Sequence, residues 1–116
     1  MYRLEINALP PSLNQFYAGV HWSKRKDWMA IWHGLWRAAL QEAHVPRPLN
    51  APVTLSVTEY CKSHLRDCDN AVIAAKGLGD ALVQYGYLPD DGPEFISCVI
   101  LKSCKGESNK TVALIE

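Results

Sequence analysis

Neither sign of charge is in excess in this chain of 116 residues, because 12 Lys and Arg residues balance 12 Asp and Glu residues. A neutral chain gives no support for strong nonspecific attraction to nucleic acid, so any basic surface has to be local. Long apolar runs are also lacking, since none approaches the roughly 18 residues of a membrane-spanning helix. Met1–Pro11 has neither the basic nor the apolar region of a secretory signal. We therefore expect no membrane partner and a cytoplasmic location.

CxxC pairs are missing as well, although the chain has four cysteines, at Cys61, Cys68, Cys98 and Cys104. In a chain without a secretory signal, the expected state is reduced thiols. One alternative is a tetrahedral zinc site in which Cys98 or Cys104 joins Cys61, His64 and Cys68, although this spacing fits no common zinc module. The other is that Cys61, Cys98 and Cys104 are small apolar residues on strands.

Repeats, low-complexity tracts and linkers are lacking too, and 48% hydrophobic with 21% charged residues is typical of a globular protein. We predict a single domain, residues 1–116. Alternating polarity predicts strands, and a period near 3.6 predicts helices. The expected elements are strands at Met1–Ala8, Val53–Tyr60, Phe95–Lys102 and Thr111–Ile115, helices from Ser23 to about His44 and at Asn70–Gln84, and a hairpin loop at Lys105–Asn109. This order, βαβαββ, predicts an α/β (α+β) fold in which two main helices cover one face of a mixed four-stranded sheet.

Aromatic residues make up only 9% of the chain, yet tryptophans concentrate on the first expected helix. Trp28, Trp32 and Trp36 recur at i, i+4 and i+8, which places them on one helix face. A stripe of this kind is typical of a core or of a dimer face. The alternative is that one ring, such as Trp22, stacks on an unpaired base.

Carboxylates gather in the second half of the chain, at Asp67, Asp69, Asp80, Asp90 and Asp91. Taken singly they have ordinary explanations: Asp69 or Asn70 is a good helix N-cap, and Asp91 stands in a turn. Taken together, they are costly to hold close unless something positive lies among them. Mg²⁺ takes oxygen ligands and is commonly held by one or two carboxylates, waters and substrate phosphates.

One lysine lies within this acidic segment. Lys76 and Asp80 follow Asp69 by seven and eleven residues, so at about 100° per residue the three side chains fall near one helix face. Asp67 and Asp69 point the same way in extended backbone. Mg²⁺ held by such acids polarises a phosphoryl oxygen and lowers the pKa of a bound water, while a nearby lysine stabilises developing negative charge. The pattern therefore indicates phosphodiester chemistry.

The main basic run, Lys24 to Lys26 with Arg25 between them, falls in the first turn of the first expected helix. Cations there oppose the helix dipole, and a phosphate partner would explain their placement because helix N-termini and lysines both suit anions. The alternative is a frayed, solvated loop. Asn14 and Tyr17 are further candidates for substrate contact.

Several motifs occur in a recognisable order along nearly the whole chain. They are Leu9-Pro10-Pro11-Ser12-Leu13-Asn14, Arg66-Asp67-Cys68-Asp69-Asn70, Lys76, Asp80-Ala81-Leu82, Gly86 and Asp90-Asp91. In this order the chain resembles the RusA-type Holliday junction resolvases, which are small, dimeric, metal-dependent endonucleases of phages, prophages and bacteria. The segment Arg-Asp-x-Asp-Asn with a downstream Lys and Asp-Asp is the more specific part of the resemblance.

The resemblance implies a Mg²⁺-dependent, structure-selective endodeoxyribonuclease that resolves Holliday junctions and other branched DNA in recombination and repair. It implies a homodimer in the cytoplasm of a bacterial or phage-infected cell. The expected catalytic residues are Asp67, Asp69, Lys76 and Asp91. The expected ligands of Mg²⁺, or of Mn²⁺ in its place, are Asp67, Asp69, Asp90 and Asp91. The expected DNA contacts are Asn14, Lys24, Arg25, Lys26 and Arg66.

Two features depart from the family pattern. Asn70 and Lys76 stand nearly one helical turn further apart than in the best-known form of the motif. The segment before Asp67, where a basic run is common, has only Lys62 and Arg66 as firm cations, and weaker phosphate neutralisation gives weaker, less salt-sensitive binding. With the zero net charge, these departures favour one alternative function: a catalytically silent relative that binds nucleic acid or another protein.

Overall fold

The computed structural model describes residues 1–116 as one mixed sheet with helices packed on it. The strands are β1 (Tyr2–Ile6), β2 (Val53–Cys61), β3 (Ile96–Lys105) and β4 (Lys110–Ile115), and the helices are α1 (Leu13–Tyr17), α2 (Trp22–Glu42), the 3₁₀ turn η1 (Cys68–Ala71) and α3 (Val72–Gln84). The expected α+β fold, with four strands and two main helices, is confirmed; α1 and η1 are additions. No helix combines the length and the apolar character needed to cross a bilayer.

The strand order in the sheet is β1-β4-β2-β3. β2 pairs parallel with β3 on one side and antiparallel with β4 on the other. The expected hairpin at Lys105–Asn109 is therefore wrong, because β2 separates the two strands that this loop joins. The loop instead crosses the end of β2, where the Gly106 amide donates to the Cys61 carbonyl at 3.1 Å. A Cβ at Gly106 would lie only 3.0 Å from Tyr60 Cβ, so this close crossing favours glycine.

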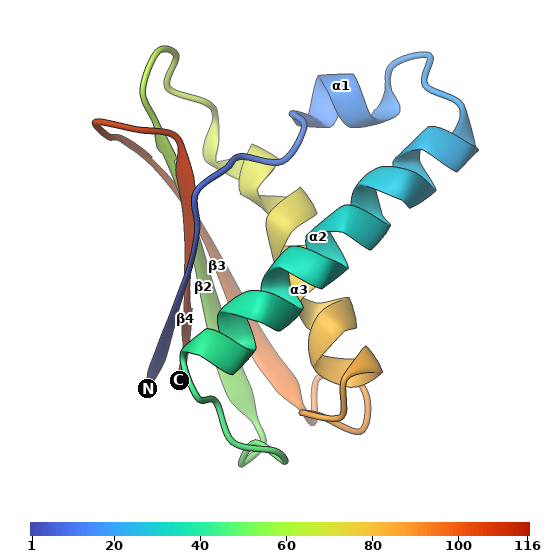
Figure 1. Cartoon of the computed structure of the whole chain (residues 1–116), viewed down its shortest axis with the longest axis vertical. Coiled ribbons are helices and arrows are strands. Elements are labelled where there is room, and N and C mark those ends of the chain that lie inside the picture. Colours follow the sequence, from blue (N-terminus) through green and yellow to red (C-terminus); the bar gives the residue numbers. More distant parts are fainter.

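The helices α2 and α3 lie on the same face of the sheet, and the two chain ends lie side by side (Figure 1). The core fills the space between the sheet and these two helices. On the helix-facing side, β2 contributes Val53, Leu55 and Val57, all nearly or fully buried. The two helices are joined by a buried hydrogen bond from Trp36 Nε1 to the Ala74 carbonyl, at 3.0 Å. Burying the indole N–H requires such a partner.

The tryptophan stripe on α2 changes its role along the helix. Trp32 and Trp36 are buried, which confirms that this part of the stripe is core. Trp28 is half-buried, and Trp22, in the first turn, is 61% exposed. The first turns of α2 lie away from the sheet, next to α1 (Figure 1). Trp22 and Trp28 therefore do not pack on the sheet as Trp32 and Trp36 do.

Two helix starts differ from expectation. Helix α2 was expected to begin at Ser23 and instead begins one residue earlier, at Trp22, where His21 is the N-cap and its Nδ1 accepts the Ser23 amide at 3.2 Å. The short helix α1 was not expected, although its capping box is visible in the sequence: Ser12 Oγ accepts the Gln15 amide and Gln15 Oε1 accepts the Ser12 amide.

Candidate functional site

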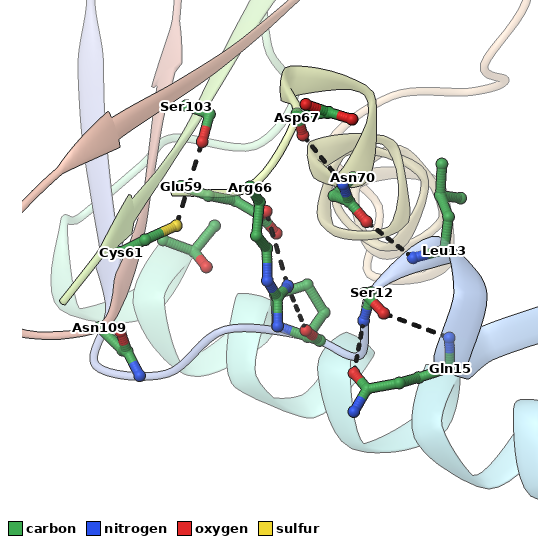
Figure 2. A network of polar contacts seen from close by, with 12 residues as sticks. Ser12, Leu13, Gln15, Glu59, Cys61, Arg66, Asp67, Asn70, Ser103 and Asn109 are labelled. Atoms are coloured by element: carbon green, nitrogen blue, oxygen red, sulfur yellow. Dashed lines mark hydrogen bonds and ion pairs between the residues drawn. The ribbon is translucent and has the colours of Figure 1, made fainter. Parts of the chain in front are cut away.

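Asn70 fastens the Asp67–Asn70 segment to the rest of the molecule. Its Oδ1 accepts the Leu13 amide at 2.8 Å, and its Nδ2 donates to the Asp67 carbonyl at 3.0 Å (Figure 2). The expected N-cap role of Asp69 or Asn70 is wrong, because neither η1 nor α3 has a side-chain cap. The amide of Asn70 is used instead to tie η1 to α1, 57 residues away in the sequence. The Asp67 and Asp69 side chains remain exposed.

Arg66 makes a second link between the same two segments. Its Nη1 donates to the Pro10 carbonyl at 2.8 Å and lies 3.6 Å from Glu59 Oε1 (Figure 2). The Pro-Pro-Ser segment and the Arg-Asp-x-Asp-Asn segment are thus neighbours in space, joined by Arg66 and Asn70. This arrangement holds the backbone at Asp67 on both sides.

Glu59 is a residue that the motif analysis missed. Its carboxylate is fully buried on the helix-facing side of β2, and neither oxygen has a hydrogen-bond partner. Thr111, its cross-strand neighbour on β4, donates its hydroxyl to the Ala8 carbonyl instead. Burial raises the pKa of Glu59 above its ordinary value, and the Arg66 guanidinium acts in the opposite direction. Strand alternation could have found this residue, because it places Glu59 on the same face as the buried Val57.

Lys76, Asp80 and Asp91 line one hollow of about 420 Å³, which we call the Lys76 hollow. Lys76 and Asp80 are one turn apart on α3, and Asp91 comes from the loop before β3. Apolar side chains, among them Val72 and Val99, form the rest of the wall. The hollow therefore combines a cation and two carboxylates against an apolar surface.

Two contacts involve carboxylates at or beside the Lys76 hollow. Asp80 Oδ2 lies 3.5 Å from His33 Nε2 of α2, and both side chains are half-buried. Asp90 Oδ1 accepts the Asp91 amide at 2.8 Å. Such a hydrogen bond from a nearby backbone N–H to an Asp side chain is typical of turns.

Asp67 and Asp69 are not among the residues that line the Lys76 hollow. Asp69 lies in η1, where each residue turns by more than the 100° of an α-helix, so the face expected to carry Asp69, Lys76 and Asp80 does not run straight from η1 into α3. The helical spacing brings Lys76 and Asp80 to one hollow. Asp67 and Asp69 lie instead around the start of η1, which leads into α3.

The carboxylates expected to hold Mg²⁺ lie in two places along the chain, Asp67 with Asp69 around the start of η1 and Asp90 with Asp91 before β3. No three His, Cys, Asp or Glu side chains form a group that could hold a metal ion. Oxygen donors are nevertheless the ligands that Mg²⁺ takes, and one or two carboxylates with waters and substrate phosphates satisfy it. Either pair thus has suitable donor chemistry, and the assignment of ligands stays a prediction.

The cysteines lie in different surroundings. Cys61 is buried on β2, with its Sγ 4.0 Å from Ser103 Oγ, whereas Cys68, Cys98 and Cys104 are exposed. All three of Cys61, Cys98 and Cys104 lie on strands as expected, Cys61 on β2 and the other two on β3. Only Cys61 is buried there as a small apolar residue would be. The zinc alternative finds no group of three ligands around Cys61 and Cys68.

Four of the five residues expected to contact DNA lie around the first turns of α2 and α1, whereas Arg66 lies between β2 and η1. Lys24 and Lys26 are exposed, and Lys24 Nζ lies 5.3 Å from the centre of the Trp28 ring. Arg25 is half-buried, because it donates to the Val20 carbonyl at 2.9 Å and packs near the Tyr17 ring. Asn14 is exposed on α1.

Comparison of the chain with models of protein families and with curated proteins finds no match.

Proposed function

We propose that this protein is a Mg²⁺-dependent, structure-selective endodeoxyribonuclease that resolves Holliday junctions and other branched DNA. One observation carries the proposal: Lys76 and Asp80 of α3 and Asp91 of the loop before β3 line the same hollow. A cation beside carboxylates suits phosphodiester hydrolysis, because the cation can stabilise negative charge that grows on the phosphate and carboxylate oxygens are ligands that Mg²⁺ takes.

The residues proposed for catalysis and metal binding then have definite roles. Lys76 donates to the phosphate oxygen on which negative charge grows. Asp67, Asp69, Asp90 and Asp91 would hold Mg²⁺, which when bound polarises the phosphate and supplies a water of lowered pKa. Arg66, tied to Pro10 and Glu59, fixes the backbone that presents Asp67.

The proposal extends to the assembly and its setting. A four-way junction has two-fold symmetry and needs two cuts, and a homodimer with C₂ symmetry supplies two sites from one chain. Selectivity would come from DNA shape and backbone contacts, with Lys24, Arg25 and Lys26 meeting phosphates. The setting would be recombination and repair in the cytoplasm of a bacterial or phage-infected cell.

The test is cleavage of a labelled synthetic four-way junction, with Mg²⁺ and with EDTA, beside a linear duplex of the same sequence. We expect paired, symmetric nicks only in the junction and only with Mg²⁺. Lys76→Ala should lower the cleavage rate by roughly 10²–10³-fold, the usual effect of removing one charge-stabilising donor. Lys102→Ala is the matched control, because Lys102 is an exposed lysine on β3 that does not line the hollow.

Asp69→Ala should abolish cleavage and leave junction binding largely intact. If Asp69→Ala or Lys76→Ala cuts at the wild-type rate, the assignment of catalytic residues is wrong.

A second candidate is a catalytically silent module that binds branched nucleic acid. The observation in its favour is that no three of the carboxylates come together in one group. A gel shift separates the two candidates: junction binding with no Mg²⁺-dependent product, at protein concentrations that saturate the junction, would support the binding module.

A further inference from the structure

A second hollow lies between α1, the first half of α2 and the Pro10–Pro11 segment. Its volume is about 680 Å³, within the range of about 300–1,000 Å³ for small-molecule sites. We call it the Trp28 hollow, and the lining residues that matter below are Pro11, Gln15, Lys24, Trp28 and Arg66. It is separate from the Lys76 hollow and shares no lining residue with it.

The charge of the Trp28 hollow is suited to an anion. Lys24 and Arg66 contribute two cations, and none of the lining residues is a carboxylate. Arg66 is held in place by the Pro10 carbonyl at 2.8 Å and by the buried Glu59. These contacts engage Nη1, and a guanidinium carries five N–H donors, so donors remain for a ligand in the hollow. A fixed guanidinium of this kind binds phosphate with little further loss of entropy.

The wall of the hollow is aromatic. Trp28 is half-buried, and the Phe16 ring supports it at 5.8 Å with an angle of 30° between the ring planes. Lys24 Nζ lies 5.3 Å from the Trp28 ring centre, a contact that is weak at an exposed site and easily exchanged for a stacked base. Gln15 uses its Oε1 to accept the Ser12 amide, which leaves its side-chain NH₂ as a donor.

We propose that the Trp28 hollow holds one unpaired nucleotide of a DNA strand, with the base against Trp28 and the phosphates on Lys24 and Arg66. The inference rests on the proposed function in taking DNA as the substrate, and it adds the feature that is recognised: a base released from pairing near the branch point. Aromatic stacking beside a basic groove is the usual way in which single strands are bound.

The experiment uses fluorescein-labelled hexathymidylate and a strand of equal charge in which all six bases are absent. Anisotropy titrations in EDTA compare the wild type with Trp28→Leu, Lys24→Ala, Trp22→Leu and Lys102→Ala. We expect wild type to bind hexathymidylate more tightly than the abasic strand. Trp28→Leu should weaken hexathymidylate binding at least about fivefold and remove the preference for bases.

Lys24→Ala should weaken the binding of both strands and make the dependence on salt shallower, because one phosphate contact is lost. Removing this exposed lysine costs only its weak contact with the Trp28 ring. The proposal therefore stays testable even if Trp28→Leu proves unstable by circular dichroism. Lys102→Ala removes the same charge outside the hollow and should bind as wild type does. Trp22→Leu removes the exposed ring, which lies outside the lining of the hollow, and should also leave the preference for bases unchanged.

Three results would overturn the proposal. In the first, the abasic strand binds wild type as tightly as hexathymidylate does, which would mean that the protein recognises the charged backbone and not the bases. In the second, Trp22→Leu or Lys102→Ala weakens binding as much as Trp28→Leu or Lys24→Ala does. In the third, an acidic peptide such as hexaglutamate displaces hexathymidylate at equal concentration, which would make the hollow a peptide site. Because these titrations need no Mg²⁺ or cleavage, absence of junction cutting with intact Trp28-dependent binding would count against the nuclease alone.

Discussion

Removal of Arg66 should destabilise the fold in a way that depends strongly on pH. Arg66 Nη1 is 3.6 Å from Glu59 Oε1, and the Glu59 carboxylate has no other polar partner and no exposure. In Arg66→Met the aliphatic packing is largely kept and the charge is lost. The variant therefore leaves a buried carboxyl group that has to be either charged without a partner or protonated.

Protonation sets the size of the effect. The ordinary pKa of Glu59 is 4.5, and each pH unit above that value costs about 1.36 kcal/mol to keep the group protonated. At pH 7 the penalty is thus about 3.4 kcal/mol, and at pH 5 about 0.7 kcal/mol. Loss of the hydrogen bond to the Pro10 carbonyl adds roughly 1–3 kcal/mol at both pH values. The total at pH 7, about 4–6 kcal/mol, lies at or above the upper end of the roughly 3–5 kcal/mol lost when a buried ion pair loses one partner.

The sign follows from proton linkage. Burial raises the folded-state pKa of Glu59 above 4.5, so the folded protein binds more protons than the unfolded chain in this window. The contribution of Glu59 is fully present below pH 4.5 and is lost as pH rises through the folded-state pKa. Without Arg66, which acts to lower that pKa, the loss extends to higher pH and becomes larger.

Urea denaturation of wild type and Arg66→Met at pH 5 and pH 7 measures the effect. We expect the difference in unfolding free energy to be larger at pH 7 by up to about 2–3 kcal/mol. This is an upper limit because wild-type Glu59, whose pKa is also raised, already carries part of the same cost. In the Glu59→Gln background the same Arg66→Met change should show no such dependence on pH, since an amide does not ionise. An equal loss at both pH values in the wild-type background would refute the electrostatic account and assign the effect to packing.

Two further predictions concern stability. Asn70→Ala should lower the unfolding free energy by about 1–3 kcal/mol and speed hydrogen exchange at the Leu13 amide, because this N–H loses its acceptor; unchanged exchange would show that water replaces it. Gly34→Ala should raise the unfolding free energy by about 0.5–1 kcal/mol, since Gly34 lies inside α2 and a Cβ added there would meet nothing within 4 Å. Gly106→Ala is its counterpart and should destabilise, because its Cβ would press on Tyr60; equal effects of the two changes in a thermal melt would contradict this explanation.

Most elements could be predicted from the sequence because their patterns are local. Val53–Tyr60 alternates in polarity over a few residues, and β2 occupies Val53–Cys61. The tryptophan repeat indicated an amphipathic helix, and Trp32 and Trp36 are in the core. The pairing of strands could not be predicted in the same way: the loop before Lys110 looks like a hairpin, yet β2 lies between β3 and β4.

In the candidate site, too, local contacts could be predicted from the sequence and contacts between remote segments could not. The one-turn spacing of Lys76 and Asp80 is a property of any α-helix, so the sequence by itself placed these two side chains on one face, and the structure puts both in one hollow. Only the tertiary structure decided that Asp91 joins them, that Asn70 binds Leu13 and that Glu59 meets Arg66. The physical reason is distance along the chain: backbone geometry fixes neighbours within a turn or a strand, whereas contacts between remote segments depend on how the whole core packs.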